Sequence, residues 1–263
     1  MQIRQPSFVC PAALVLMTLA VCGCGKTSTE PSQPADPKAA GKDSGTSAGH
    51  AAGPAQSQRL EWEKLNGEAT SLYQQGKYDP AMVAAKKALQ IAEQMAGPNR
   101  SALATSLYTL GLLYKAQGQY AQAEPLYQRS LAIYEKFYGP DHPSVATGLN
   151  NLAALYEAQG QYTQAEPLYQ RSLAIYKKAH APDHAVAASL NNLAESYRAQ
   201  GQYAKAEPLY RDSLALREKA LGPNHPDVAQ SLENMAKLYR KTGREDAAKE
   251  LEKHAAAIRA IKH

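Results

Sequence analysis

Apolar residues recur every three or four positions through most of the chain after Trp62, which is the spacing that places side chains on one face of an α-helix. One clear stretch contains two such runs, on either side of Gly160. The runs consist of Leu149, Leu152 and Tyr156, then Tyr162, Ala165, Tyr169, Leu173 and Tyr176. Gly160 stands where the end of a helix needs a positive φ, so the stretch predicts two amphipathic helices joined by a tight turn.

This hairpin pattern recurs five times, and one glycine marks each copy. The glycines lie 41 or 42 residues apart and are Gly76, Gly118, Gly160, Gly201 and Gly243. A single hairpin of this size cannot bury its own apolar faces, whereas stacked copies share one continuous core, and roughly three copies suffice for stability. We therefore expect an all-α fold over residues 58–263: a right-handed α-solenoid of five helix-hairpin repeats with ten helices.

The repeated residues resemble those of the tetratricopeptide repeat. The positions that carry the resemblance are Leu149, Leu152, Ala153, Tyr156, Gly160, Tyr162, Ala165, Tyr169 and Leu173. The long period, the Leu-Asn-Asn-Leu-Ala run and the connector Gly139–Pro143 are similar to the kinesin-light-chain type, over about 200 of the 263 residues. The resemblance implies a scaffold that binds a protein or peptide, without identifying the ligand.

In this family the first helix of each repeat lines a concave groove. If Leu149 is the large motif residue, the positions one, five and eight residues later face that groove. They predict a partner-binding groove that includes Tyr108, Lys115, Asn150, Asn191, Glu195, Arg198, Lys237 and Arg240. The basic residues among them favour a partner with some acidic character.

Two asparagine pairs in the predicted groove allow two interpretations. In kinesin-light-chain-like repeats the residues that match Asn150 and Asn191 bind the backbone of an extended peptide. An asparagine amide suits that role because it accepts from an N–H and donates to a C=O at once. In the alternative, Asn150–Asn151 and Asn191–Asn192 tie adjacent helices together, and the second member of each pair favours this structural use.

The N-terminal residues predict a different kind of segment. Phe8–Val21 is apolar but too short to span a bilayer, and a basic residue precedes it, so residues 1–23 are typical of a signal peptide. The ending Val21–Cys24 resembles a bacterial lipobox, which implies a lipid on Cys24. An ordinary cleaved signal with incidental cysteines is the alternative.

Residues 24–57 are rich in small and polar residues and are expected to form the lipidated N-terminus and a disordered tether. Gly25, rather than an aspartate, follows Cys24, which favours an outer-membrane lipoprotein facing the periplasm of a bacterial cell envelope. With Cys10 and Cys22 removed, the mature chain would keep no cysteine for a disulfide or a metal site.

Other functions have little support in the sequence. A net charge of +5 without a basic cluster does not indicate nucleic-acid binding. His142, His184 and His225 recur once per repeat in the connectors, which favours capped turns over a metal site, with Asp141 and Asn224 as capping candidates. No nucleophile–base or paired-carboxylate arrangement predicts an enzyme, and no cofactor is expected.

Two functions remain open. The favoured one is a monomeric, membrane-anchored interaction scaffold whose groove binds an extended peptide or a partner helix. The alternative is a permanent accessory subunit of an envelope assembly, such as secretion, pilus or cell-wall machinery. A permanent subunit should expose a contiguous apolar patch, whereas a transient scaffold should keep a polar, solvated groove.

Overall fold

The computed structural model describes residues 54–95 and 100–261. The expected signal peptide, Cys24 and the tether up to residue 53 lie outside the described residues. The first helix begins at Pro54, four residues before the expected start at Gln58, so the end of the expected tether is helical. Proline suits a first helical turn because its missing N–H has no partner there. The periodicity could not show this turn, since residues 54–57 contain no large apolar side chain.

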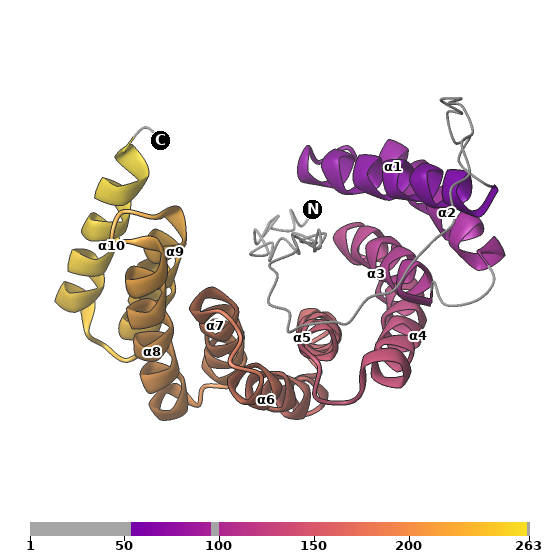
Figure 1. Cartoon of the computed structure of the whole chain (residues 1–263). Coiled ribbons are helices and arrows are strands. Elements are labelled where there is room, and N and C mark those ends of the chain that lie inside the picture. The colour runs from indigo at the N-terminus through magenta and orange to yellow at the C-terminus, as the bar shows by residue number, and fades with distance from the viewer. Residues whose placement is uncertain (1–53, 96–99, 262–263) are drawn as a thin grey trace, which may run out of the picture. The chain divides into compact units, whose positions relative to one another are not determined.

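Ten α-helices form five consecutive hairpins in the described part of the chain, which confirms the predicted all-α solenoid of five repeats. The first helices of the repeats are α1 (Pro54–Gln74), α3 (Arg100–Ala116), α5 (Pro143–Ala158), α7 (Asp183–Ala199) and α9 (Pro226–Lys241). The second helices are α2 (Tyr78–Gln94), α4 (Tyr120–Tyr138), α6 (Tyr162–Lys178), α8 (Tyr203–Leu221) and α10 (Glu245–Ala260). Within residues 54–261 the first helices stack along one side of the array, and the second helices stack along the other (Figure 1). We call the surface formed by α1, α3, α5, α7 and α9 the first-helix face.

The turn inside each hairpin is closed by its glycine, as the sequence predicts. Gly160 has a φ of 73°, a conformation that costs little only for glycine. This allows the N–H of Gln161 to donate to the carbonyl of Tyr156 at 2.8 Å, and the same bond joins Gln119 to Tyr114 at 2.9 Å. These bonds satisfy carbonyls that the end of a helix otherwise leaves open. The tight turn fixes the two helices of each repeat side by side.

Two of the longer connectors between repeats end in a histidine cap. The imidazole Nδ1 of His142 accepts from the backbone N–H of Ser144 at 3.1 Å, and that of His225 accepts from Asp227 at the same distance. Capped turns are therefore confirmed at both connectors, but the cap is the histidine and not Asp141 or Asn224. Burial lowers the pKa of His142, which favours the neutral ring that capping requires.

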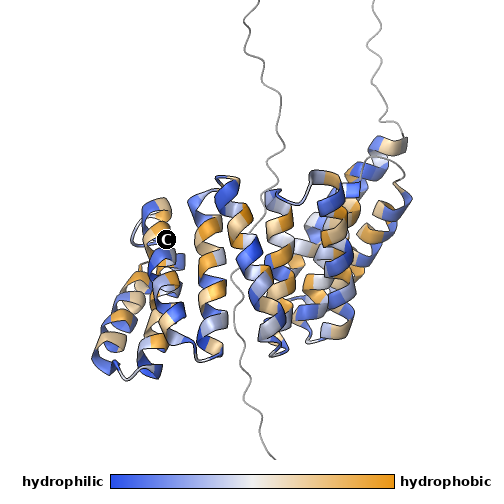
Figure 2. Cartoon of the chain, turned by 90° about the horizontal axis from the view of Figure 1, so that it is seen from below, coloured by the Kyte–Doolittle hydropathy of each residue, from blue (hydrophilic) through white to orange (hydrophobic). Residues whose placement is uncertain are grey.

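The core lies between the two helices of each hairpin and between neighbouring hairpins. Apolar and polar residues alternate around the helices (Figure 2). Small residues such as Ala153 and Ala165 are fully buried where the helices approach closely. A serine also ties the hairpins of the middle repeats, since Ser130, Ser172 and Ser213 each donate to a carbonyl of the first helix at 2.8 Å. Among the described helices, none is both long and apolar enough to cross a membrane.

Candidate functional site

Side chains on adjacent first helices are joined by direct hydrogen bonds. In each bond the Oδ1 atom of an asparagine accepts from a side chain of the next repeat. Thr109 donates to Asn66 at 3.1 Å, Ser189 donates to Asn150 at 3.4 Å, and Asn234 donates to Asn191 at 3.1 Å. We call these six residues the polar ladder.

The two predicted peptide-binding asparagines differ in accessibility. Asn191 is only 7% exposed, and its partner Asn234 is 6% exposed, so this bond is buried between α7 and α9. Asn150 is half-buried, and its bond to Ser189 is long. The contacts of Asn191 are those of the structural alternative, whereas Asn150 keeps a more accessible amide. The second asparagine Asn151 donates to the carbonyl of Thr147 within its own helix at 2.7 Å, a structural use.

A second set of contacts crosses from the second helix of a repeat to its first helix. The hydroxyl of Tyr169 donates to Glu157 at 2.8 Å, and the hydroxyl of Tyr210 donates to Glu195 at 2.5 Å. Both tyrosine rings are almost fully buried, so their hydroxyls reach the first-helix face from the core. Arg198 also binds Glu195 through two nitrogens.

The carboxylates of Glu157 and Glu195 have opposite pKa shifts. Burial raises the pKa of Glu157 to about 7, although the Tyr169 hydrogen bond and the charges of Lys115 and Arg198 oppose the shift. Glu195 is also partly desolvated, but the hydrogen bonds from Arg198 and Tyr210 outweigh burial and lower its pKa. Near neutral pH Glu195 is therefore ionised, whereas Glu157 exchanges its proton.

Most of the basic residues predicted for the groove have partners inside the chain. Arg198 is paired with Glu195, and Arg240 is held by Glu245 and Glu252 of α10, each at 2.7 Å. Lys237 is exposed and donates to Asn234 at 3.2 Å, within the polar ladder. Intramolecular pairing therefore reduces the positive potential that the sequence predicts for this surface.

The first-helix face is more apolar in the second repeat. Tyr108 is half-buried, and its ring centroid lies 5.9 Å from that of Tyr127. Leu112 is also half-buried and packs against the core beside Tyr108. The predicted groove residues thus lie in two regions: an aromatic region at α3, which Lys115 ends with a positive charge, and a charged region at α5, α7 and α9.

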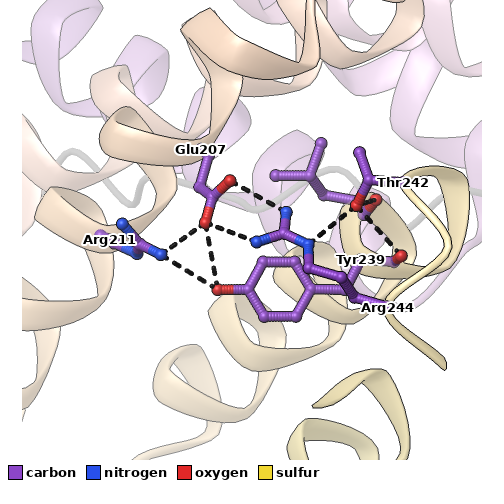
Figure 3. A network of polar contacts seen from close by, with 6 residues as sticks. Glu207, Arg211, Tyr239, Thr242 and Arg244 are labelled. Atoms are coloured by element: carbon purple, nitrogen blue, oxygen red, sulfur yellow. Dashed lines mark hydrogen bonds and ion pairs between the residues drawn. The ribbon is translucent and has the colours of Figure 1, made fainter. Parts of the chain in front are cut away.

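A further contact fixes how each repeat sits against the one before it. The hydroxyls of Tyr156, Tyr197 and Tyr239 donate to Glu124, Glu166 and Glu207 of the preceding repeat, at 2.9, 3.0 and 3.3 Å. At the last junction the guanidinium of Arg244 binds both oxygens of Glu207 at 2.9 Å. It also stacks on Tyr239, with 3.7 Å from Cζ to the ring centroid (Figure 3). These contacts set the spacing of the first helices, and therefore of the candidate site.

Sequence reasoning missed the contribution of the core tyrosines, because their spacing is that of packing residues. Part of the signal was available in the offset between partners, which is twelve residues in two repeats but fifteen between Glu195 and Tyr210. Glu157 and Tyr169 are twelve residues apart, and so are Arg240 and Glu252. The same number of residues separates Lys115 from Tyr127.

Comparison with known proteins agrees with this architecture. A family model described as tetratricopeptide repeat matches residues 63–136, 103–178 and 185–260. No curated protein has significant sequence similarity to the chain. Two solved structures of a kinesin-light-chain-like protein of Podosopora anserina, with nearly identical TPR-like repeats, are 28% identical. They have TM-scores of 0.64 and 0.63, over 77% of this chain and 95% and 96% of those chains.

Two further structures share the fold at lower identity. BtubC (BKLC) from P. vanneervenii is 24% identical with a TM-score of 0.67, over 79% of this chain and 82% of that chain. A Rap protein in complex with Competence and Sporulation Factor is 19% identical with a TM-score of 0.66. That match covers 76% of this chain and 54% of the Rap chain.

Proposed function

The chain belongs to the tetratricopeptide repeat family, whose repeats form protein–protein interaction scaffolds. On that premise we propose that it is a membrane-anchored scaffold whose first-helix face binds an extended peptide segment of a partner protein. The observation that carries the proposal is the polar character of that face, with a half-buried amide at Asn150 and an exposed ammonium at Lys237. A Rap protein of similar fold, solved in complex with Competence and Sporulation Factor, gives precedent for ligand binding by such an array.

Extended backbone is the ligand that these groups suit best. A peptide in extended conformation presents its N–H and C=O groups in sequence, and amides and ammonium groups can pair with them. The polar ladder joins α1 to α3 and links α5, α7 and α9, so it fixes the first helices within each of these two groups. The affinity should come mainly from backbone contacts, with sequence preference set by the aromatic region at α3 and the charged region beyond it.

A photochemical cross-link tests this assignment. A photoreactive amino acid in place of Lys237, on the first-helix face, should capture a partner in detergent-solubilised membranes. The same amino acid in place of the exposed Ala174 on α6 should capture much less. Equal capture at both positions, or capture at Ala174 alone, would contradict binding at the first-helix face.

The alternative of a permanent envelope subunit predicts a contiguous apolar surface. The exposed large apolar residues of the described chain are distributed over several elements: Leu60, Tyr78, Val83, Phe137, Tyr138 and Ile261. Of these, Phe137 and Tyr138 have adjacent rings, with centroids 4.7 Å apart. This distribution favours a transient scaffold. Affinity purification that returns one partner in constant stoichiometry would instead support the permanent subunit.

The proposed anchor is a lipid on Cys24, at the outer membrane and facing the periplasm. Its support is the sequence Val21–Cys24 after a short apolar segment. Mass spectrometry of the mature protein should find Cys24 as the first residue, with added lipid mass. An unmodified N-terminus, or a start at another residue, would overturn the anchoring proposal while leaving the scaffold proposal intact.

A further inference from the structure

The hydroxyl of Tyr127 is the one buried side-chain polar atom in the described chain that lacks a hydrogen-bond partner. Tyr127 is 2% exposed, and burial raises the pKa of its hydroxyl well above the ordinary value, so it stays protonated as a donor. A buried polar group without a partner costs free energy, and such groups are uncommon in native structures. The position therefore calls for an explanation.

Equivalent positions in the other repeats show which group normally accepts a hydrogen bond from this hydroxyl. One repeat later Tyr169 donates to Glu157, and two repeats later Tyr210 donates to Glu195. In the last repeat the arrangement is reversed, because the second helix supplies Glu252 and the first helix supplies Arg240, at 2.9 Å. A carboxylate is thus present where the second helix meets the first helix in each of the last three repeats, and we call this place the junction.

The second repeat keeps the donor and replaces the acceptor. The position of Glu157 is occupied there by Lys115, and the position of Glu195 is occupied by Leu112. By the repeat register, two donor groups, the Tyr127 hydroxyl and the Lys115 ammonium, stand at positions where the following repeats have an acid. The charge of Lys115 also acts on Glu157 of the next repeat. An ammonium has three N–H donors, so Lys115 can accommodate a further acceptor beside its present contacts.

The packing of the Tyr127 ring against α3 supports the same conclusion. At the equivalent positions the hydroxyls of Tyr169 and Tyr210 reach α5 and α7, so the register predicts that the Tyr127 hydroxyl is directed toward α3. Gly111 permits a close approach, since a Cβ atom there would lie 2.9 Å from two ring carbons of Tyr127. The equivalent residue one repeat later is Ala153. Tyr108 lies on the same surface, with its ring next to that of Tyr127.

We propose that a carboxylate of the bound peptide occupies this junction, accepting from the Tyr127 hydroxyl and the Lys115 ammonium. The partner thereby supplies the acid that Glu157, Glu195 and Glu252 supply in the following repeats. This inference rests on the proposed function, because it specifies the ligand of the same face. The hydroxyl is shielded before binding, so the side chains that cover it must rotate when the carboxylate enters.

The carboxylate could belong to an acidic side chain or to a peptide C-terminus, and a peptide selection separates them. Random peptides are displayed on phage in two libraries, one with a free C-terminus and one fused at both ends, and selected on the purified full chain. We expect enriched peptides to share an Asp or Glu in both libraries if a side chain binds. Enrichment in the free C-terminus library alone identifies a terminal carboxylate.

Affinities of a synthesised selected peptide then test the contact. Tyr127→Phe and Lys115→Gln should each weaken binding roughly tenfold or more, as expected for a hydrogen bond to a charged group. Tyr169→Phe is the matched control and should change affinity little, because that hydroxyl is already bound by Glu157. Neutralising the carboxylate of the peptide should cost as much as Tyr127→Phe, and the two changes together should not add.

The outcomes distinguish the two claims. Selected peptides without a shared carboxylate, or an affinity that Tyr127→Phe and Lys115→Gln leave unchanged, would overturn this inference and leave the proposed function standing. If neither library yields a binder, the inference and the proposed peptide-binding function fail together. Thermal unfolding of each variant confirms that a loss of affinity does not come from a loss of fold.

Discussion

Asn234 donates its side-chain amide to the Oδ1 atom of Asn191, and this buried bond of 3.1 Å joins the first helices of the last two repeats. Removing the acceptor leaves the amide of Asn234 buried without its partner. We therefore expect Asn191→Ala to lower the free energy of unfolding by about 1–3 kcal/mol. Urea unfolding measures the change.

Asn150→Ala is the matched comparison for that variant. Its bond to Ser189 is longer and less buried, so its effect on unfolding should be smaller than that of Asn191→Ala. Its effect on the affinity of a selected peptide should be the larger of the two. The reverse ranking in both measurements would show that Asn191 is the peptide contact and that Asn150 is structural.

The sequence alone predicts the helices and the turns, but not how far each side chain is buried by neighbouring helices. Periodicity gives the face of the helix on which Asn191 lies. A side chain on that face can still be exposed to solvent or covered by the neighbouring helix. Because Asn234 reaches across from α9, the expected ligand contact is buried. Likewise, Arg240 has the spacing of a groove residue, yet Glu245 and Glu252 hold it. The first outcome depends on a contact between two repeats, and the second on a contact between the two helices of one hairpin. The periodicity of a single helix contains neither.

Glu157 should make stability depend on pH. Its pKa is raised by burial to about 7, so the folded chain keeps a proton that the unfolded chain releases at a lower pH. The wild-type chain therefore loses stability as the pH rises from about 4.5 to about 7, and this contribution stays lost at higher pH. We expect Glu157→Gln to be more stable than the wild type at pH 8 by about 1–3 kcal/mol, with little difference at pH 4.

Denaturant unfolding of both proteins across this pH range checks the prediction. Glu195→Gln is a suitable contrast, because the pKa of Glu195 is lowered and its ionised form is stabilised by Arg198 and Tyr210. That variant should be less stable than the wild type at pH 8. If Glu157→Gln also loses stability at pH 8, Glu157 is better stabilised as a carboxylate than its burial indicates.

The Arg244 contact should hold the last repeat in place. Its guanidinium binds Glu207 through two nitrogens and stacks on Tyr239 (Figure 3). We expect Arg244→Ala to destabilise the chain by only about 1 kcal/mol, since the pair is partly exposed. Hydrogen exchange should become faster in α9 and α10 and stay unchanged in α5. Arg244→Lys should cause most of the same destabilisation, because lysine lacks the planar guanidinium that binds both oxygens of Glu207.

The unpaired hydroxyl of Tyr127 gives a stability prediction that needs no ligand. Tyr127→Phe removes a buried group without a partner, so the free energy of unfolding should stay the same or rise by up to about 1 kcal/mol. Tyr169→Phe should instead lower it by about 1–3 kcal/mol at pH 8, because Glu157 loses a hydrogen-bond donor. A marked loss of stability in Tyr127→Phe would mean that the hydroxyl has a partner within the folded protein.

Hydrogen–deuterium exchange of the full chain, with and without a peptide selected from a random library, shows whether the first-helix face is the binding surface. Binding along this face predicts slower exchange in α3, α5, α7 and α9, strongest around Lys115 and Asn150, with little change in α4, α6 and α8. Protection confined to the second helices, or none at saturating peptide, would mean that the peptide does not bind along the first-helix face.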